Sequence, residues 1–149
     1  DMMLAAQYAN TNGPAPAADH YEAALAKQPQ FSPLIKSYAE FLLAQREPER
    51  LLEIIAPLEK DRKFLFDYHA LRGKALHVQG NNVQAVRTLL EANKLYDSDT
   101  SVLNALGAAL ANTGEKAEAR NVLEASLRLN PEQADVKKLL ENLEKGRKP

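Results

Sequence analysis

The 149-residue sequence contains no cysteine and no tryptophan. Without cysteine the chain has no disulfide, no thiolate metal site and no thiol nucleophile. The same absence assigns no cellular compartment, because proteins without cysteine occur in oxidising and reducing surroundings alike.

An excess of charge of either sign is also missing, since 19 basic and 20 acidic residues leave a net charge of -1. A chain without a basic field has little attraction for a phosphate backbone, so we expect no nucleic-acid partner. No apolar run approaches the roughly 20 residues that span a bilayer, which predicts no direct membrane insertion. The first residues, Asp1 to Leu4, lack the layout of a signal peptide.

Sequence motifs for chemistry are absent as well: there is no glycine-rich phosphate loop, no serine elbow and no zinc-protease helix motif. His69 and His77 lie eight residues apart in one predicted helix. A metal site would need a third ligand, and the nearby Asp61 and Asp67 have no spacing that supplies one. We therefore predict no catalytic residue, no bound metal and no cofactor.

What the sequence does contain is an internal repeat of 34 residues. Six residues recur at that offset: Gly73 as Gly107, Leu76 as Leu110, Gly80 as Gly114, Ala85 as Ala119, Leu89 as Leu123 and Leu95 as Leu129. A regular period of this length is typical of stacked repeat architectures. The period divides the chain into a single array of four units, 1–31, 32–65, 66–99 and 100–133, followed by a capping helix at 134–146.

Each unit contains two helical patterns. In the last unit, two sets of apolar residues recur at three- and four-residue steps: Val102, Leu103, Leu106 and Leu110, then Val122, Leu123, Leu127 and Leu129. Gly114 lies between them and predicts a tight turn. Asn130 and Pro131 predict the N-cap and first turn of the final helix.

Small residues occupy fixed places in the units. Ala5, Ala39, Gly73 and Gly107 share one position of the period, and Ala17, Ala85 and Ala119 share another. A small side chain lets two helix axes approach closely, so these positions predict helix-to-helix contacts. The second unit differs, because Pro57 falls inside its second helix and predicts an irregular or shortened helix there.

With these marks the chain resembles the tetratricopeptide repeat. The last unit matches best, through Leu103, Leu106, Gly107, Leu110, Gly114, Ala119, Leu123 and Pro131, whereas the second unit has Arg46 at the turn glycine. The resemblance implies an all-α fold, a right-handed α-solenoid of antiparallel helix pairs that coils into a superhelix.

The resemblance also implies a concave groove lined by the first helices of the pairs. Arithmetic on the period places these residues there: Lys36, Glu40, Leu71, Lys74, His77, Asn104, Ala108, Asn112, Lys138 and Asn142. Asparagine amides on either side of a small Ala108 suit a peptide or helix laid in the groove. The lysines favour an acidic segment or a free C-terminal carboxylate.

Some family members hold chaperone tails in a carboxylate clamp of lysines and asparagines, and here the pattern is incomplete. Lys36 matches one lysine, but Glu40 and Leu71 stand where asparagines belong. We therefore do not assign chaperone-tail binding.

The aromatic residues Phe31, Phe64, Phe66 and Tyr68 gather at unit boundaries, where packing between units or an exposed hot spot are the two interpretations. Met2, Met3 and Leu4 begin a shortened first helix, which suggests excision from a longer protein or a homodimer contact at this edge. The sequence predicts a non-catalytic interaction scaffold. The alternatives are a self-association module and a recruiting appendage of an enzyme encoded elsewhere in a longer chain.

Overall fold

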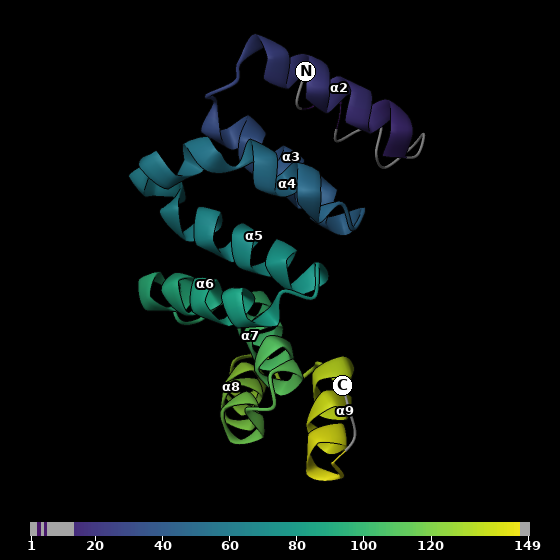
Figure 1. Ribbon diagram of the computed structural model, residues 1–149, viewed down its shortest axis with the longest axis vertical. Coiled ribbons are helices and arrows are strands. Elements are labelled where there is room, and N and C mark those ends of the chain that lie inside the picture. The colour runs from purple at the N-terminus through teal and green to yellow at the C-terminus, as the bar shows by residue number, and fades with distance from the viewer. Residues whose placement is uncertain (1–2, 4, 6–13, 147–149) are drawn as a thin grey trace. The chain divides into compact units, whose positions relative to one another are not determined.

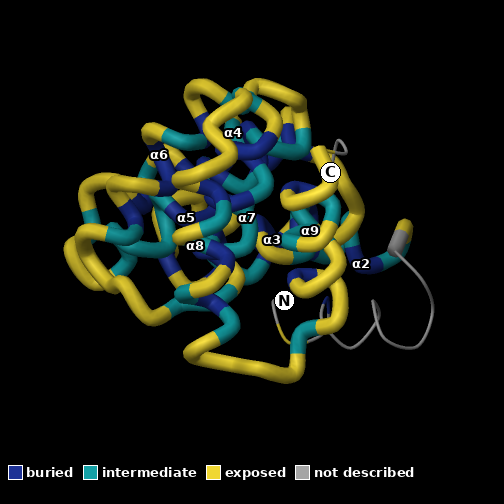
Figure 2. Tube along the Cα trace, turned by 90° about the horizontal axis from the view of Figure 1, so that it is seen from below, coloured by how far each residue is buried: buried dark blue, intermediate teal, exposed yellow. Residues whose placement is uncertain are grey.

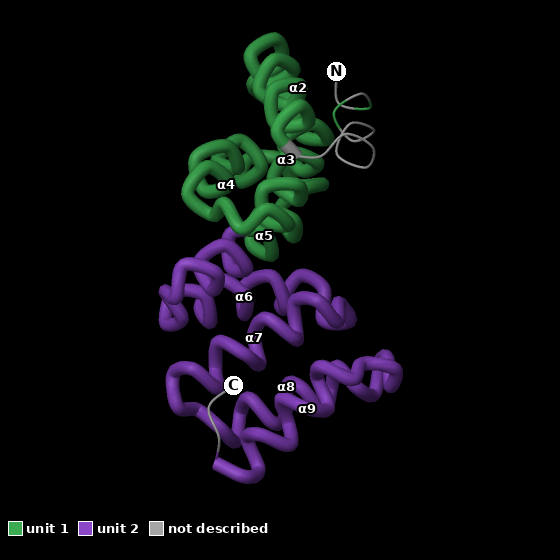
Figure 3. The backbone as a smooth tube through the Cα atoms, turned by 90° about the vertical axis from the view of Figure 1, so that its right-hand side faces the viewer, with its two compact units in different colours: residues 1–71 green, residues 72–149 purple. Residues whose placement is uncertain are grey.

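The computed structural model describes residues 3, 5 and 14–146, and every regular element in those residues is helical (Figure 1). The α-helices are α2 (Pro14–Lys27), α3 (Ser32–Ala44), α4 (Pro48–Ile54), α5 (Leu65–Val78), α6 (Asn82–Leu95), α7 (Thr100–Asn112), α8 (Lys116–Leu129) and α9 (Ala134–Glu144). Two short 3-10 helices, η1 (Ala56–Lys60) and η2 (Arg62–Phe64), lie between α4 and α5. The chain forms two compact units, Asp1–Leu71 and Arg72–Pro149, which divide within α5 (Figure 3).

In the first unit α3 lies between its neighbours and contacts α2, α4 and η1. Its apolar stripe is buried, with Leu34, Ile35 and Leu42 at most 2% exposed. Aromatic rings join α2 to α3, because Tyr21 stacks on Tyr38 with ring centroids 4.9 Å apart. Burial of these side chains is the main stabilising contribution to this unit.

The irregular helix predicted from Pro57 is present. α4 ends at Ile54 after only seven residues, and the chain continues as η1. Proline has no N–H to donate, so the α-helical hydrogen-bond ladder cannot pass through it. Asp61 then holds the linker in place, since its carboxylate accepts from Lys63 N at 3.2 Å and from the Ser32 hydroxyl of α3 at 2.7 Å.

In the second unit α7 contacts α6, α8 and α9, so its apolar face is surrounded by helices. Figure 2 shows the alternation of buried and exposed residues along these helices. The small positions are sites of close approach: a Cβ added to Gly73 would lie 2.5 Å from Leu89 Cγ, and one added to Gly107 would lie 2.5 Å from Leu123 Cγ. Two helices therefore meet where the sequence predicts a gap for a neighbouring leucine.

The start of the last helix differs from the prediction. α9 begins at Ala134, and Asn130 instead ends α8, where its backbone N–H donates to Ser126 O at 2.9 Å. The Asn130 side chain accepts from Glu132 N at 3.0 Å, which closes a local turn of the type asparagine favours. Residues 131–133 therefore belong to the turn and not to the first helical turn of α9.

Arg46 adopts the backbone conformation of a turn glycine, with a φ of 57°. Its N–H donates to Leu43 O and the next N–H, of Glu47, donates to Leu42 O, the same hydrogen-bond pattern that Gly80 and Gly114 form at the ends of α5 and α7. This left-handed C-terminal motif suits glycine because a Cβ is strained there.

We expect Arg46→Gly to raise the free energy of unfolding by about 0.5–1 kcal/mol, because relief of the strain exceeds the extra entropy of glycine in the unfolded chain. Gly80→Ala is the matched opposite change, at a φ of 82°, and should lower stability by about 1 kcal/mol. Urea denaturation followed by circular dichroism measures both. A lowered midpoint for Arg46→Gly would show that the arginine side chain stabilises this turn.

Candidate binding surface

The predicted groove residues of the first unit offer little to a partner. Lys36 Nζ lies 3.4 Å from Asp67 Oδ1, so its charge is already compensated within the unit. Leu71 was expected to line the groove, but it is buried with 6% of its surface exposed. Of the three, Glu40 alone is fully on the surface.

In the second unit two predicted residues of α5 are engaged in local contacts. Lys74 Nζ donates to the Ser101 hydroxyl at 2.6 Å, and that hydroxyl donates to Asp99 at 2.6 Å. Burial would raise the pKa of Asp99, but hydrogen bonds from Ser101 and Val102 together with the Lys74 charge hold it below its usual value. His77 Nδ1 lies 2.8 Å from the Asn82 side-chain oxygen at the turn into α6. These groups stabilise the junctions of helices.

Asn104 also makes internal contacts, and its surroundings were not foreseen. Its side-chain oxygen accepts from the Ser126 hydroxyl of α8 at 2.6 Å, and its side-chain nitrogen donates to Gln133 Oε1 at 2.8 Å. Gln133 Nε2 in turn donates to Ser126 O at 3.2 Å. We call Asn104, Ser126 and Gln133 the α7–α9 polar hub. The signal in the sequence that could have indicated this hub is Ser126, a polar residue within the apolar stripe of α8. In the structure Ser126 is fully buried.

In the second unit four of the predicted residues remain accessible, all on α7 and α9. Asn112 and Lys138 are exposed, and Ala108 and Asn142 are half-buried. Because α7 contacts α9, these residues belong to neighbouring first helices of one compact unit. We call Ala108, Asn112, Lys138 and Asn142 the α7–α9 surface. It presents one small side chain, two amides and one cation, which suits hydrogen bonding to a peptide better than covalent chemistry.

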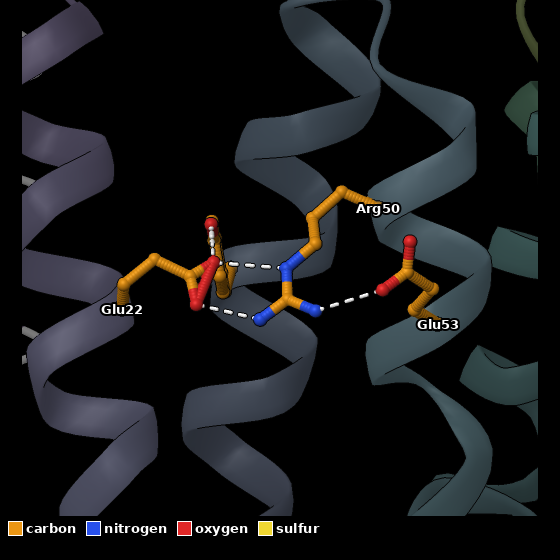
Figure 4. Close-up of polar contacts among 4 residues, drawn as sticks. Glu22, Arg50 and Glu53 are labelled. Atoms are coloured by element: carbon orange, nitrogen blue, oxygen red, sulfur yellow. Dashed lines mark hydrogen bonds and ion pairs between the residues drawn. The ribbon is translucent and has the colours of Figure 1, made fainter.

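A polar network in the first unit was also missed by sequence reasoning (Figure 4). The Glu22 carboxylate of α2 accepts from Arg50 of α4 at both oxygens, at 2.6 and 2.9 Å, and from the Tyr38 hydroxyl of α3. Arg50 also donates to Glu53 at 3.1 Å. The network joins three helices through one bidentate pair. The 34-residue period was identified from apolar and small residues, and the residues of this network lie next to those positions in the sequence. The repeat pattern therefore did not predict the network.

The Glu22 network predicts a pH dependence. Hydrogen bonds from Arg50 lower the pKa of Glu22 against the opposing effect of partial burial, and the Tyr38 hydroxyl adds to the lowering. A carboxyl with a lowered folded-state pKa contributes stability above its unfolded pKa of about 4.3, and this contribution is lost as pH falls through the folded value.

We therefore expect Glu22→Gln to lower the free energy of unfolding by about 0.5–1 kcal/mol near neutral pH, a range set by the partial exposure of the pair. The difference from wild type should disappear towards a pH of about 3. Denaturant melts across this range measure it. Glu53→Gln is the control, since that carboxylate is 64% exposed and, among the described residues, pairs with Arg50 alone, at 3.1 Å. A deficit for Glu22→Gln that does not change with pH would contradict the electrostatic origin.

Among residues 3, 5 and 14–146 no group of three or more His, Asp or Glu side chains is arranged to hold a metal ion. His69 instead lies edge-on to Tyr68, with ring centroids 5.2 Å apart. The aromatic residues Phe64, Phe66 and Tyr68 are half-buried, and Phe31 is 46% exposed. No helix in the described part of the chain is both long enough and apolar enough to cross a membrane.

Comparison with known proteins supports the resemblance that the period predicted. The sequence profile of the tetratricopeptide repeat matches residues 101–133, which include α7 from its second residue, all of α8 and the turn after it. No match is found among curated proteins.

A solved structure reported as "Functional Characterization of Pseudomonas Aeruginosa pilF" superposes with a TM-score of 0.80 over 97% of this chain at 23% identity. The chain spans 66% of the length of that structure. At this identity the likeness concerns the fold alone. Residues 101–133 thus match a tetratricopeptide repeat, and the chain has the all-α helical repeat fold of that solved structure.

Proposed function

We propose that this chain is a non-catalytic interaction scaffold that binds a peptide or a partner helix on the α7–α9 surface. Tetratricopeptide repeats generally mediate protein–protein interaction, and Ala108 and Asn112 of this surface lie in the repeat that the family profile matches, while Lys138 and Asn142 lie on the helix that follows it. The observation that carries the proposal is the accessibility of Ala108, Asn112, Lys138 and Asn142 on two contacting helices. Of the other predicted residues, Glu40 is exposed by itself in the first unit, and the rest are buried or held in contacts within the chain.

The chemistry of the partner follows from what remains unpaired. The exposed amide of Asn112 offers both a donor and an acceptor to a peptide backbone. Lys138 is exposed and provides positive charge on α9, which favours an acidic residue or a free C-terminal carboxylate in the ligand. Lys36 and Lys74 contribute less than their sequence positions suggest, because Asp67 and the Ser101–Asp99 pair lie beside them.

The test is affinity capture from a lysate of the source organism, followed by calorimetry with the purified partner. Ala108→Arg places a long cation on the surface and Lys138→Glu reverses its charge, so both should reduce affinity by about tenfold or more. Asn121→Arg is the matched control, because it adds the same side chain at an exposed position of α8. Equal binding by wild type and Ala108→Arg would reject this surface.

Self-association is the alternative that the same samples test. Met3 is 79% exposed, whereas Met2 and Leu4 lie outside the described residues. A mass that rises with concentration in sedimentation and falls on Met3→Glu would favour a homodimer at the N-terminal edge. The third possibility, a recruiting appendage of an enzyme, stays a prediction.

A further inference from the structure

The helix α6 and the residue after it carry an unusual share of the exposed apolar side chains in the described part of the chain. Seven large hydrophobic residues are exposed in the described part of the chain, and four of them lie on α6 or directly after it: Val83, Leu90, Leu95 and Tyr96. Val83 and Leu90, seven residues apart, share one face of the helix, whereas Leu95 and Tyr96 lie at its C-terminal end. Val83 is 59% exposed and Leu90 is 42% exposed. The opposite side of the helix is occupied, because Ala85, Leu89 and Ala92 are fully buried.

The packing of the repeat does not require this apolar face. The positions 34 residues after Val83 and Leu90 are Ala117 and Glu124, on the exposed face of α8. α8 belongs to the same kind of helix pair and has a small and a charged side chain at the equivalent places. Val83 and Leu90 are therefore additional to what the fold needs, whereas the exposed Leu95 has the similarly exposed Leu129 as its counterpart on α8. Exposed apolar residues that share one helix face are a feature of interaction surfaces.

The residues between the apolar ones carry positive charge. Val83, Arg87, Leu90 and Lys94 follow one another at steps of four, three and four, which is the spacing of a coiled-coil seam. We call these four residues the α6 seam. Arg87 is exposed and has no ion pair within the residues described, and Lys94 lies 3.0 Å from Glu91 on the same helix.

These charges determine which occupant fits. A second copy of α6 packed in parallel would place Arg87 against Arg87, and an antiparallel copy would place each cation against Leu90 or Val83 without a counter-charge. A helix with acidic residues in place of the cations avoids both costs. We propose that the α6 seam docks an acidic amphipathic helix of another protein, with apolar residues opposite Val83 and Leu90 and carboxylates opposite Arg87 and Lys94.

A synthetic helical peptide tests the proposal directly. The peptide has about three heptads, with leucine at one seam position and glutamate at the other, and a second peptide has lysine in place of glutamate. Fluorescence anisotropy should show that the glutamate peptide binds the intact chain at least about tenfold more tightly than the lysine peptide. Arg87→Glu should reverse this preference, and Leu90→Glu should weaken binding of the glutamate peptide by tenfold or more.

Asn121→Glu, the equivalent change on α8, is the control and should leave binding unchanged. Circular dichroism confirms that each variant is folded. Failure of the glutamate peptide to bind, or equal binding to wild type and Arg87→Glu, would overturn the proposal. A dimer in sedimentation that Leu90→Glu abolishes would also overturn it, because the occupant would then be a second copy. These outcomes do not depend on the α7–α9 surface, so the two proposals fail separately.

Discussion

Gly107→Val should lower the free energy of unfolding by about 3 kcal/mol, at the upper end of the cost of forcing extra volume into a packed core. A Cβ at this position would lie 2.5 Å from both Cγ and Cδ2 of Leu123, and these atoms belong to a leucine that is fully buried. The Cγ carbon lies close to the backbone of Leu123 and is not the free end of a flexible side chain. The contact could therefore be relieved only if α7 and α8 separated. Their separation would expose the apolar surface that is buried between α7 and α8.

Ala108→Val is the matched control, because it adds the same type of side chain one residue away, at a half-buried position. Its expected effect is about 0.5 kcal/mol or less, mostly from the lower helix propensity of valine. Urea denaturation of both variants with the same signal gives the comparison. Equal stability of Gly107→Val and wild type would mean that the helices repack freely and that the glycine is not a packing requirement.

The glycine positions show what the sequence could predict. A shared offset of 34 identified Gly73 and Gly107 as places of close approach, and the structure has Leu89 and Leu123 against them. Residues that pack in the same way recur at the same offset in the sequence, because each unit must fit against the next one. For the same reason Arg46, at the turn position held elsewhere by glycine, could be recognised as a departure, and it has a φ of 57°.

The candidate surface was harder to predict, because polar side chains at the edge of a stripe turn towards whatever partner lies nearby. Lys36 was assigned to a ligand, but Asp67 lies 3.4 Å from it. Leu71 was placed on the surface by the same arithmetic and is buried. A repeat position gives the direction of a side chain to within about one residue, or 100° of helix rotation, which is too coarse to separate an exposed edge from a buried one.

Asn104 is the residue for which it matters most whether the side chain faces a ligand or the interior of the protein. We expect Asn104→Ala to lower the free energy of unfolding by about 2–3 kcal/mol, since it removes two side-chain hydrogen bonds and leaves the buried Ser126 hydroxyl and Gln133 Oε1 without this partner. Asn112→Ala, at an exposed position of the same helix, should change stability by no more than about 0.5 kcal/mol.

A double-mutant cycle separates the hydrogen bond from the loss of volume. The residues 34 before Asn104 and Ser126 are Ala70 and Ala92, which are both buried, so the pair of alanines is compatible with the repeat. When both partners of a buried hydrogen bond are replaced, the unsatisfied groups disappear together. The double variant should therefore be more stable than the sum of the single losses predicts, by about 1 kcal/mol or more.

The same cycle decides how binding data for Asn104 are understood. If Asn104→Ala is destabilised as expected, weaker binding by this variant reflects loss of the α7–α9 polar hub, and only Ala108, Asn112, Lys138 and Asn142 report on ligand contacts. If Asn104→Ala keeps wild-type stability and the cycle shows no coupling to Ser126, the hub contributes nothing to folding. The amide would then be available to a ligand, as its place in the repeat predicted.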